Sequence, residues 1–145
     1  MNVVIASGYF NPLHKGHIQY LEAAKSFGDE LVVIVNNDPQ VRLKGSTRFM
    51  DEQERRYIVS KLRCVDEAFY AIDYERSVSL TIELIYYCPR YRGSNFLFAN
   101  GGDVTQENCR ETEVCRKLGI PMVFGVGGTN KVQSSSELLK RIIRP

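Results

Sequence analysis

Five short apolar segments alternate with helical patterns along the chain, and this alternation limits the fold more than any other feature of the sequence. The segments cover residues 3–7, 31–35, 67–72, 95–99 and 121–125. The first, Val3-Val4-Ile5-Ala6-Ser7, is apolar up to its last residue, which is typical of a central parallel strand buried on both faces. Strands that alternate with helices predict a parallel, doubly wound, five-stranded α/β sheet in a single domain, residues 1–145.

The connecting segments complete this outline. Helices are expected at about residues 17–27, 51–62, 80–87 and 138–143, and before Gly119. Asn36-Asn37-Asp38-Pro39 predicts a turn, and residues 42–48 a basic loop. In such a sheet, ligands bind outside the carboxyl ends of the strands, where the strand order reverses. Polar loops follow the first, second, fourth and fifth predicted strands, so we expect these loops to form the site.

The loop after the first strand holds the chain's only two histidines. Its sequence is Ser7-Gly8-Tyr9-Phe10-Asn11-Pro12-Leu13-His14-Lys15-Gly16-His17, and a helical pattern follows directly. A glycine-bearing turn lets the backbone approach an anion, and a helix start supplies free N–H groups and the positive end of a dipole. Histidines at that place donate hydrogen bonds where charge develops on phosphorus. The pattern predicts a phosphate site with His14 and His17 as catalytic residues.

A metal site is the main alternative for two histidines at this spacing. Zinc needs further imidazole or thiolate ligands, but the sequence has no third histidine. It also has no Cys-x-x-Cys spacing among its four cysteines, Cys64, Cys88, Cys109 and Cys115. We therefore predict no metal site built from protein ligands alone.

The segment from Gly8 to His17 resembles the signature of the HxGH nucleotidyltransferase superfamily, G-[TS]-F-[DN]-x-x-H-x-G-H. Within it, the chain is similar to the small cytidylyltransferase group, such as glycerol-3-phosphate cytidylyltransferase, and to the adenylyltransferase domain of ADP-heptose synthesis enzymes. The resemblance implies a Rossmann-like sheet and places Gly8, Tyr9, Phe10 and Gly16 at the nucleotide. Tyr9 is a departure, because a small hydroxyl or thiol residue is usual at its position.

The loop after the second strand carries three cations, Arg42, Lys44 and Arg48. A solvated loop is the ordinary interpretation of such a segment. Its place at the carboxyl end of a strand, with Gly45 beside Lys44, favours phosphate binding, because a long lysine swings onto a triphosphate as a site closes. The resemblance supports Lys44 as a catalytic and substrate-binding residue and Arg55 as a substrate-binding residue.

Two further loops are expected to bind the nucleotide. A Gly-Gly pair beside a carboxylate follows the fourth strand, as in the heptose-type enzymes, and permits close approach of a nucleoside. Three serines after the fifth strand precede a helix, where hydroxyls and free N–H groups hold the β- and γ-phosphates. An ordinary turn and an ordinary N-cap are the structural alternatives. The residues are Asn100, Gly101, Gly102 and Asp103 in the first loop and Ser134, Ser135 and Ser136 in the second.

Composition limits the partners and the compartment. A net charge of +2 on 145 residues argues against a nucleic-acid-binding surface. The sequence has no apolar run long enough to span a membrane and no signal segment. Four unpatterned cysteines fit a reducing compartment. We expect a cytoplasmic protein without nucleic-acid or membrane partners, and a homodimer.

These features together predict an enzyme that transfers CMP from CTP to a small phosphate monoester or phosphonate and releases pyrophosphate. The resemblance implies Mg²⁺, carried by the triphosphate. ATP with a phosphorylated sugar is the alternative, which the Gly-Gly-Asp element and the lack of an arginine before the serines favour. A non-catalytic nucleotide-binding module is the alternative of another class, but binding alone does not require both histidines.

Overall fold

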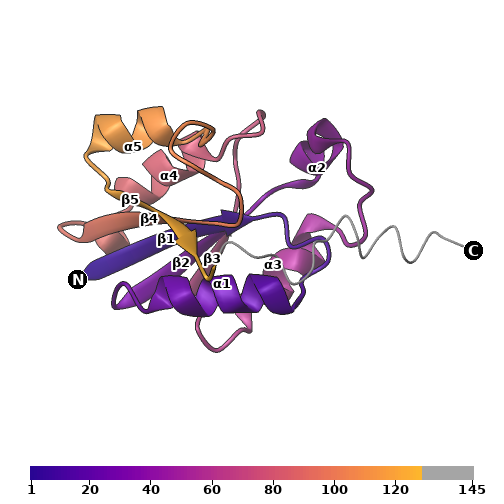
Figure 1. Cartoon of the computed structure of the whole chain (residues 1–145), viewed down its shortest axis with the longest axis horizontal. Coiled ribbons are helices and arrows are strands. Elements are labelled where there is room, and N and C mark those ends of the chain that lie inside the picture. The colour runs from indigo at the N-terminus through magenta and orange to yellow at the C-terminus, as the bar shows by residue number, and fades with distance from the viewer. Residues whose placement is uncertain (129–145) are drawn as a thin grey trace, which may run out of the picture.

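The computed structural model describes residues 1–128, which form one α/β unit around a five-stranded, entirely parallel sheet (Figure 1). The strand order is β3-β2-β1-β4-β5. The predicted doubly wound sheet is confirmed, and each predicted strand agrees with the observed one to within two residues at either end. The strands are β1 (Asn2–Gly8), β2 (Glu30–Val35), β3 (Glu67–Tyr70), β4 (Asn95–Gly101) and β5 (Met122–Val126).

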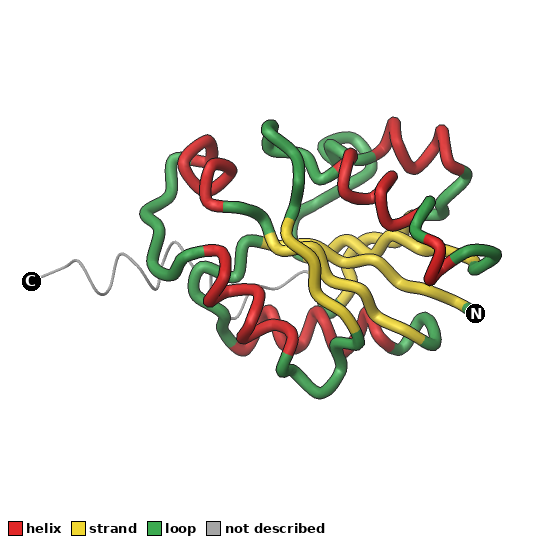
Figure 2. Tube along the Cα trace, turned by 180° about the vertical axis from the view of Figure 1, so that it is seen from behind, coloured by secondary structure: helices red, strands yellow, loops and turns green. Residues whose placement is uncertain are grey.

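Helices cover both faces of the sheet (Figures 1 and 2). Two lie below it in Figure 1 and two above it. No helix within residues 1–128 is both long and apolar enough to cross a membrane. The lower pair is α1 (Lys15–Lys25) and α3 (Glu52–Ser60), the upper pair is α4 (Ser79–Tyr86) and α5 (Thr112–Leu118), and a 3₁₀ turn, η1 (Pro89–Tyr91), precedes β4.

Successive residues of β1 pack into different cores. Val3 and Ile5 belong to the core under α4 and α5, whereas Val4 and Ala6 belong to the core over α1 and α3. Side chains alternate across a strand, so a strand covered by helices on both faces needs apolar residues at every position. This explains the continuous apolar runs in the sequence.

One segment differs from the sequence prediction. Residues 38–44, expected as a turn and part of a basic loop, form a helix, α2 (Asp38–Lys44), which stands beyond the end of the sheet (Figure 1). The Asn37 side chain accepts the N–H of Gln40 at 2.9 Å, and the Gln40 side chain accepts the N–H of Asn37 at 3.0 Å. Pro39 lies in the first turn, and Gly45 ends the helix at φ 80°. A reciprocal cap, an early proline and a closing glycine outweigh the turn propensity of this segment.

The sheet opens beside β1, where the strand order reverses. β1 pairs with β2 over residues 3–8 but with β4 only over residues 2–5. Beyond that point Tyr20 of α1 fills the gap between the strands. Its hydroxyl donates to the carbonyl of Ala99 at 2.6 Å and accepts the N–H of Ser7 at 3.4 Å. The crevice in which α/β sheets bind ligands therefore begins next to Tyr20.

Replacing Gly127 with alanine should destabilise the fold more than replacing Gly93. Both glycines have similar positive φ angles, 83° and 78°, so alanine meets comparable backbone strain at each. A Cβ at Gly127 would lie 2.8 Å from the Cα of Tyr20, whereas a Cβ at Gly93 meets no atom within 4 Å. Urea denaturation should give G127A a free energy of unfolding about 1–3 kcal/mol below that of G93A. Equal losses would contradict the close packing of this turn on α1.

Candidate active site

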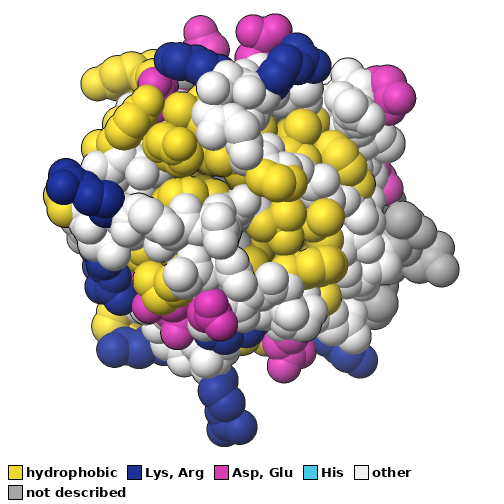
Figure 3. Space-filling view, turned by 90° about the vertical axis from the view of Figure 1, so that its left-hand side faces the viewer, with side chains coloured by type: hydrophobic (Ala, Val, Ile, Leu, Met, Phe, Trp, Pro, Cys, Tyr) yellow, Lys and Arg dark blue, Asp and Glu magenta, His cyan; other side chains and the backbone are white. Residues whose placement is uncertain are grey.

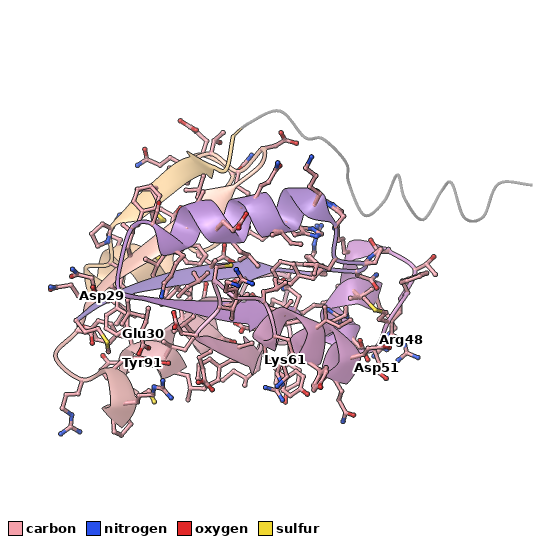
Figure 4. All side chains as sticks on the ribbon, turned by 90° about the horizontal axis from the view of Figure 1, so that it is seen from below. Asp29, Glu30, Arg48, Asp51, Lys61 and Tyr91 are labelled. Carbon is pink, nitrogen blue, oxygen red and sulfur yellow. The ribbon has the colours of Figure 1, made fainter. Side chains whose placement is uncertain are left out.

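The histidines lie at the carboxyl ends of the strands: His14 ends the loop after β1, and His17 lies in the first turn of α1. Figure 4 shows Arg48 and Asp51, from the segment between α2 and α3, at this end of the molecule, and Asp29, Glu30 and Tyr91 at the opposite end. The face at the amino ends of the strands carries apolar and charged side chains and shows no histidine (Figure 3). The candidate site is thus confined to the carboxyl end of the sheet.

The two histidines build the start of α1. Nδ1 of His14, the N-cap residue, accepts the N–H of Gly16 at 3.1 Å, and Nδ1 of His17 accepts the N–H of His14 at 3.1 Å. A neutral imidazole has one acceptor and one donor nitrogen. Because Nδ1 is the acceptor in both rings, the proton of each lies on Nε2. Each histidine therefore has an N–H donor on the ring edge opposite the helix.

Burial keeps both imidazoles neutral. The rings are stacked, with centroids 3.8 Å apart and planes 20° from parallel, and Phe10 packs edge-on against His17 at 5.1 Å. Burial, followed by the charges of His14 and Lys44, lowers the pKa of His17 to about 3. Burial also lowers the pKa of His14. At neutral pH the pair thus presents hydrogen-bond donors and carries no imidazolium charge.

Gly8 and Phe10 shape the turn before the histidines. Phe10 has φ 50°, an uncommon value for a residue with a side chain. Its buried ring folds back over Gly8, where a Cβ would lie 2.8 Å from the phenylalanine Cζ. Glycine is needed at position 8 because of this ring, and its predicted contact with a nucleotide stays a prediction, as do those of Phe10 and Gly16.

Arg55, predicted to bind substrate, is completely buried. Its Nη1 donates to the carbonyls of Tyr9 at 2.8 Å and Asn36 at 2.6 Å, and its Nε to the carbonyl of Met50 at 3.0 Å. Its Nη2 donates to the carboxylate of Asp38 at 2.8 Å. Burial raises the pKa of Asp38, but hydrogen bonds, that from Arg55 foremost, outweigh it and hold the pKa below its usual value. The structure corrects the prediction: Arg55 joins four segments behind the site, and its donors are directed at protein acceptors.

Asn11 is a residue of the signature that sequence reasoning did not single out. Its side chain donates to the carbonyl of Thr47 at 2.8 Å and accepts the N–H groups of Phe49 at 2.8 Å and Met50 at 3.2 Å. Asn11 is almost fully buried. It therefore attaches the segment between α2 and α3 to the histidine loop. Asn11 occupies the position of the signature at which Asp or Asn is usual, and this could have identified it from the sequence.

Lys44 lies next to the histidine loop, at the end of a helix and not in the basic loop that the sequence predicted. It is the last residue of α2, and its Nζ lies 4.4 Å from the centroid of the Tyr9 ring. Its charge contributes to the lowered pKa of His17. The structure thus brings Tyr9, His14, His17 and Lys44 together, and their roles toward a ligand stay predictions.

The loop after β4 borders the crevice beside Tyr20. A Cβ at Gly101 would lie 2.6 Å from Cδ1 of Tyr20, so this glycine makes room for the tyrosine. The side chain of Asn100 is buried and donates to the carbonyl of Val123 at 3.3 Å, and its predicted contact with a nucleotide stays a prediction. Gly102 has φ 59°, and Asp103 is exposed. The three predicted phosphate-binding serines, Ser134, Ser135 and Ser136, lie outside the described residues.

A cavity of about 500 Å³ at the same edge of the sheet was not predicted from the sequence. Two buried or partly buried amides fix its wall: Asn37 donates to the carbonyls of Ala71 and Asp73, and Gln40 to those of Glu75 and Ser77, all within 3.0 Å. The cavity is therefore tied to the end of β2 and to α2. Its lining residues are Asp73, Tyr74, Glu75, Arg76, Ser77, Ser79, Leu80 and Arg110.

A known protein family matches this chain over most of its length. Residues 5–128 match the family described as Cytidylyltransferase-like. The chain belongs to this family. The predicted resemblance to the nucleotidyltransferase superfamily is thereby confirmed.

Similar proteins include one much longer chain and two of similar length. Over 97% of its length the chain is 34% identical to the Bifunctional protein HldE of Pelobacter propionicus, of which it spans only 27%. It is 32% identical to the FAD synthase of Picrophilus torridus, with 97% of this chain and 95% of that protein covered. The crystal structure of the lipopolysaccharide core biosynthesis protein from Thermoplasma volcanium superposes with a TM-score of 0.67 at 31% identity, covering 92% of this chain and 99% of that one.

Replacing Arg55 with methionine should strongly destabilise the cytidylyltransferase-like domain. The variant leaves three buried or partly buried carbonyl groups without this donor and removes the buried partner of Asp38. Breaking such a network costs about 3–5 kcal/mol. Chemical denaturation of R55M measures this loss, and the exposed Arg42 of α2 provides the control R42M, which should lose little. Similar stabilities of R55M and R42M would contradict the structural role of Arg55.

Acidification should destabilise the protein through His17. The pKa of histidine is about 6.5 in an unfolded chain but about 3 at this folded site, so the unfolded chain binds more protons between these values. The folded state therefore has its full stability, as far as His17 is concerned, above pH 6.5. Part of this stability is lost as the pH falls toward 3, because only the unfolded chain takes up the proton. His17→Asn keeps a cap acceptor without titrating, so its free energy of unfolding should fall less than that of the wild type between about pH 7 and about pH 5. Equal losses in denaturant titrations would show that His17 does not titrate as described.

Proposed function

We propose that this chain is a nucleotidyltransferase that joins a nucleoside monophosphate to the phosphate of a small molecule. The observation that carries the proposal is the pair of neutral histidines: Nδ1 of each accepts an N–H at the start of α1, and Nε2–H of each has no hydrogen-bond acceptor within residues 1–128. Two such donors beside a helix N-terminus suit an anion on which charge builds. Membership of the Cytidylyltransferase-like family supports the same reaction.

In the proposed reaction, an oxygen of the acceptor phosphate attacks the α-phosphorus of a nucleoside triphosphate in line. The new O–P bond forms as the bond from the α-phosphorus to the α–β bridging oxygen breaks, and pyrophosphate leaves with that electron pair. No proton transfer to the protein is required, because the attacking oxygen is already ionised. His14 and His17 stabilise charge on the α-phosphate and the bridging oxygen, while Lys44 draws the anions together.

Mg²⁺ enters this proposal with the triphosphate. Among residues 1–128 no three His, Cys, Asp or Glu side chains are grouped to hold a metal ion. This fits a Mg²⁺ ion that is held by phosphate oxygens and water and needs at most one or two carboxylates. Asp103, exposed in the loop after β4, is the carboxylate that would approach it. When bound, the ion neutralises charge on the phosphates.

We assign the acceptor to the cavity after β3. Arg76 and Arg110 line it, and within residues 1–128 neither guanidinium has an ion-pair partner. Two arginines suit a phosphate group, and the exposed side chains of Tyr74 and Leu80 suit the organic part. The acceptor is therefore a small organic phosphate or phosphonate. In this assignment Arg76 and Arg110 take the part that the sequence suggested for Arg55.

ATP is the nucleotide that the relatives favour. The FAD synthase makes a product that contains adenine, and this chain spans nearly all of that protein's length. CTP is the second candidate, predicted from the sequence resemblance and consistent with the description of the matching family.

Calorimetric titration with ATP and with CTP, each with Mg²⁺, distinguishes them, since the true substrate should bind and the other should not. Binding of neither would overturn the proposed function; the homodimer and the cytoplasmic location stay predictions outside this test.

Replacing either histidine should lower turnover far more than nucleotide affinity. Asparagine is the informative substitution, because its amide oxygen replaces the Nδ1 cap acceptor while the Nε2–H donor is lost. H14N and H17N should each reduce turnover about 100-fold or more while melting within a few degrees of the wild type. Pyrophosphate release with the better nucleotide and a panel of phosphomonoesters measures this. Nucleotide binding without turnover in the wild type over the whole panel would instead favour a non-catalytic binding module.

A further inference from the structure

The aromatic ring of Tyr9 is in direct contact with the charge of Lys44. The lysine Nζ lies 4.4 Å from the ring centroid, well within the range of a cation–π interaction. The signature of the superfamily has a small residue where this chain has Tyr9. A small side chain offers no aromatic face, so the contact is a property of this chain and not of the signature.

Both partners of this contact are carried by well-fixed backbone. The carbonyl of Tyr9 accepts a hydrogen bond from buried Arg55 at 2.8 Å, and the next residue, Phe10, is buried. Lys44 ends a helix that is closed at its start by the reciprocal cap of Asn37 and Gln40. The lysine side chain extends from this fixed backbone, and its ammonium lies over the Tyr9 ring.

The position of the Lys44 ammonium over the Tyr9 ring brings its charge close to the histidine pair. The Lys44 ammonium is one of the charges that lower the pKa of His17, so it lies close enough for its field to reach that ring. A polyphosphate bound at the Nε2–H groups of His14 and His17 would therefore also lie in the field of the ammonium. An ammonium already held there costs less side-chain entropy on binding than one that must be gathered from solution.

We propose that Tyr9 is a positioning residue that holds the Lys44 ammonium beside His17 before the substrate binds, and so increases affinity for the polyphosphate part of the nucleotide. The benefit to nucleotide binding rests on the proposed function, whereas the positioning of Lys44 is a property of the free protein. Tyr9→Leu replaces the aromatic face with a smaller aliphatic side chain, and Tyr9→Phe retains the ring without the hydroxyl.

The first measurement is made on the free protein. In proton NMR spectra, the ring current of Tyr9 should shift the Cε protons of Lys44 upfield in the wild type and in Y9F. The shift should disappear in Y9L. A lysine signal at its ordinary position in the wild type, or one unchanged in Y9L, would overturn the positioning role whatever the enzyme's activity.

The second measurement is a double-mutant cycle on affinity for magnesium tripolyphosphate, followed by calorimetry. Y9L should weaken binding about 2- to 5-fold, the value of an exposed cation–π contact, and Y9F should restore it. In a Lys44→Met background, Y9L should have no further effect. Equal effects of Y9L with and without Lys44 would overturn the inference while leaving the proposed function intact. A wild type that binds neither tripolyphosphate nor a nucleotide would overturn both.

Discussion

The buried guanidinium of Arg55 is the interaction on which the candidate site depends. It joins the carbonyl of Tyr9 in the histidine loop, the carbonyl of Asn36 after β2, the carboxylate of Asp38 at the start of α2 and the carbonyl of Met50 before α3. Arginine alone presents five donors in a fixed fork, so one side chain can fix all four segments. Each segment carries or borders a residue of the site, and this network holds the four segments together.

The histidines divide their two nitrogens between structure and chemistry. Nδ1 of each accepts a backbone N–H at the start of α1, and this bond would be lost if Nδ1 took up a proton. The helix cap thus favours the neutral ring, in agreement with the lowered pKa values of His14 and His17. Positive charge comes instead from Lys44 and from the positive end of the α1 dipole. The hydrogen bonds that begin α1 therefore also keep the two rings neutral.

The carboxyl edge of the sheet brings the two proposed anion-binding regions into one surface. The histidine pair and Lys44 lie on one side, and the cavity with Arg76 and Arg110 lies beyond β2 and β3. Asn37 and Gln40 connect them, since both are part of the α2 cap and both bind the backbone of the cavity wall. This arrangement suits a reaction between two phosphorylated molecules, in which most of the enzyme's task is to hold like charges together.

The sequence by itself determined the five strands of the sheet, most of its helices and the place of the two histidines at a helix start, because these depend on short-range signals. Apolar runs, caps and the spacing of His14 and His17 all act within a few residues. Only the tertiary structure decided which individual polar side chains are buried and which are exposed. Arg55 and Lys44 look alike in the sequence, yet one is buried by partners up to 46 positions away and the other stays at the surface beside Tyr9. The burial of a charge depends on which distant carbonyl groups surround it, and no local pattern records that.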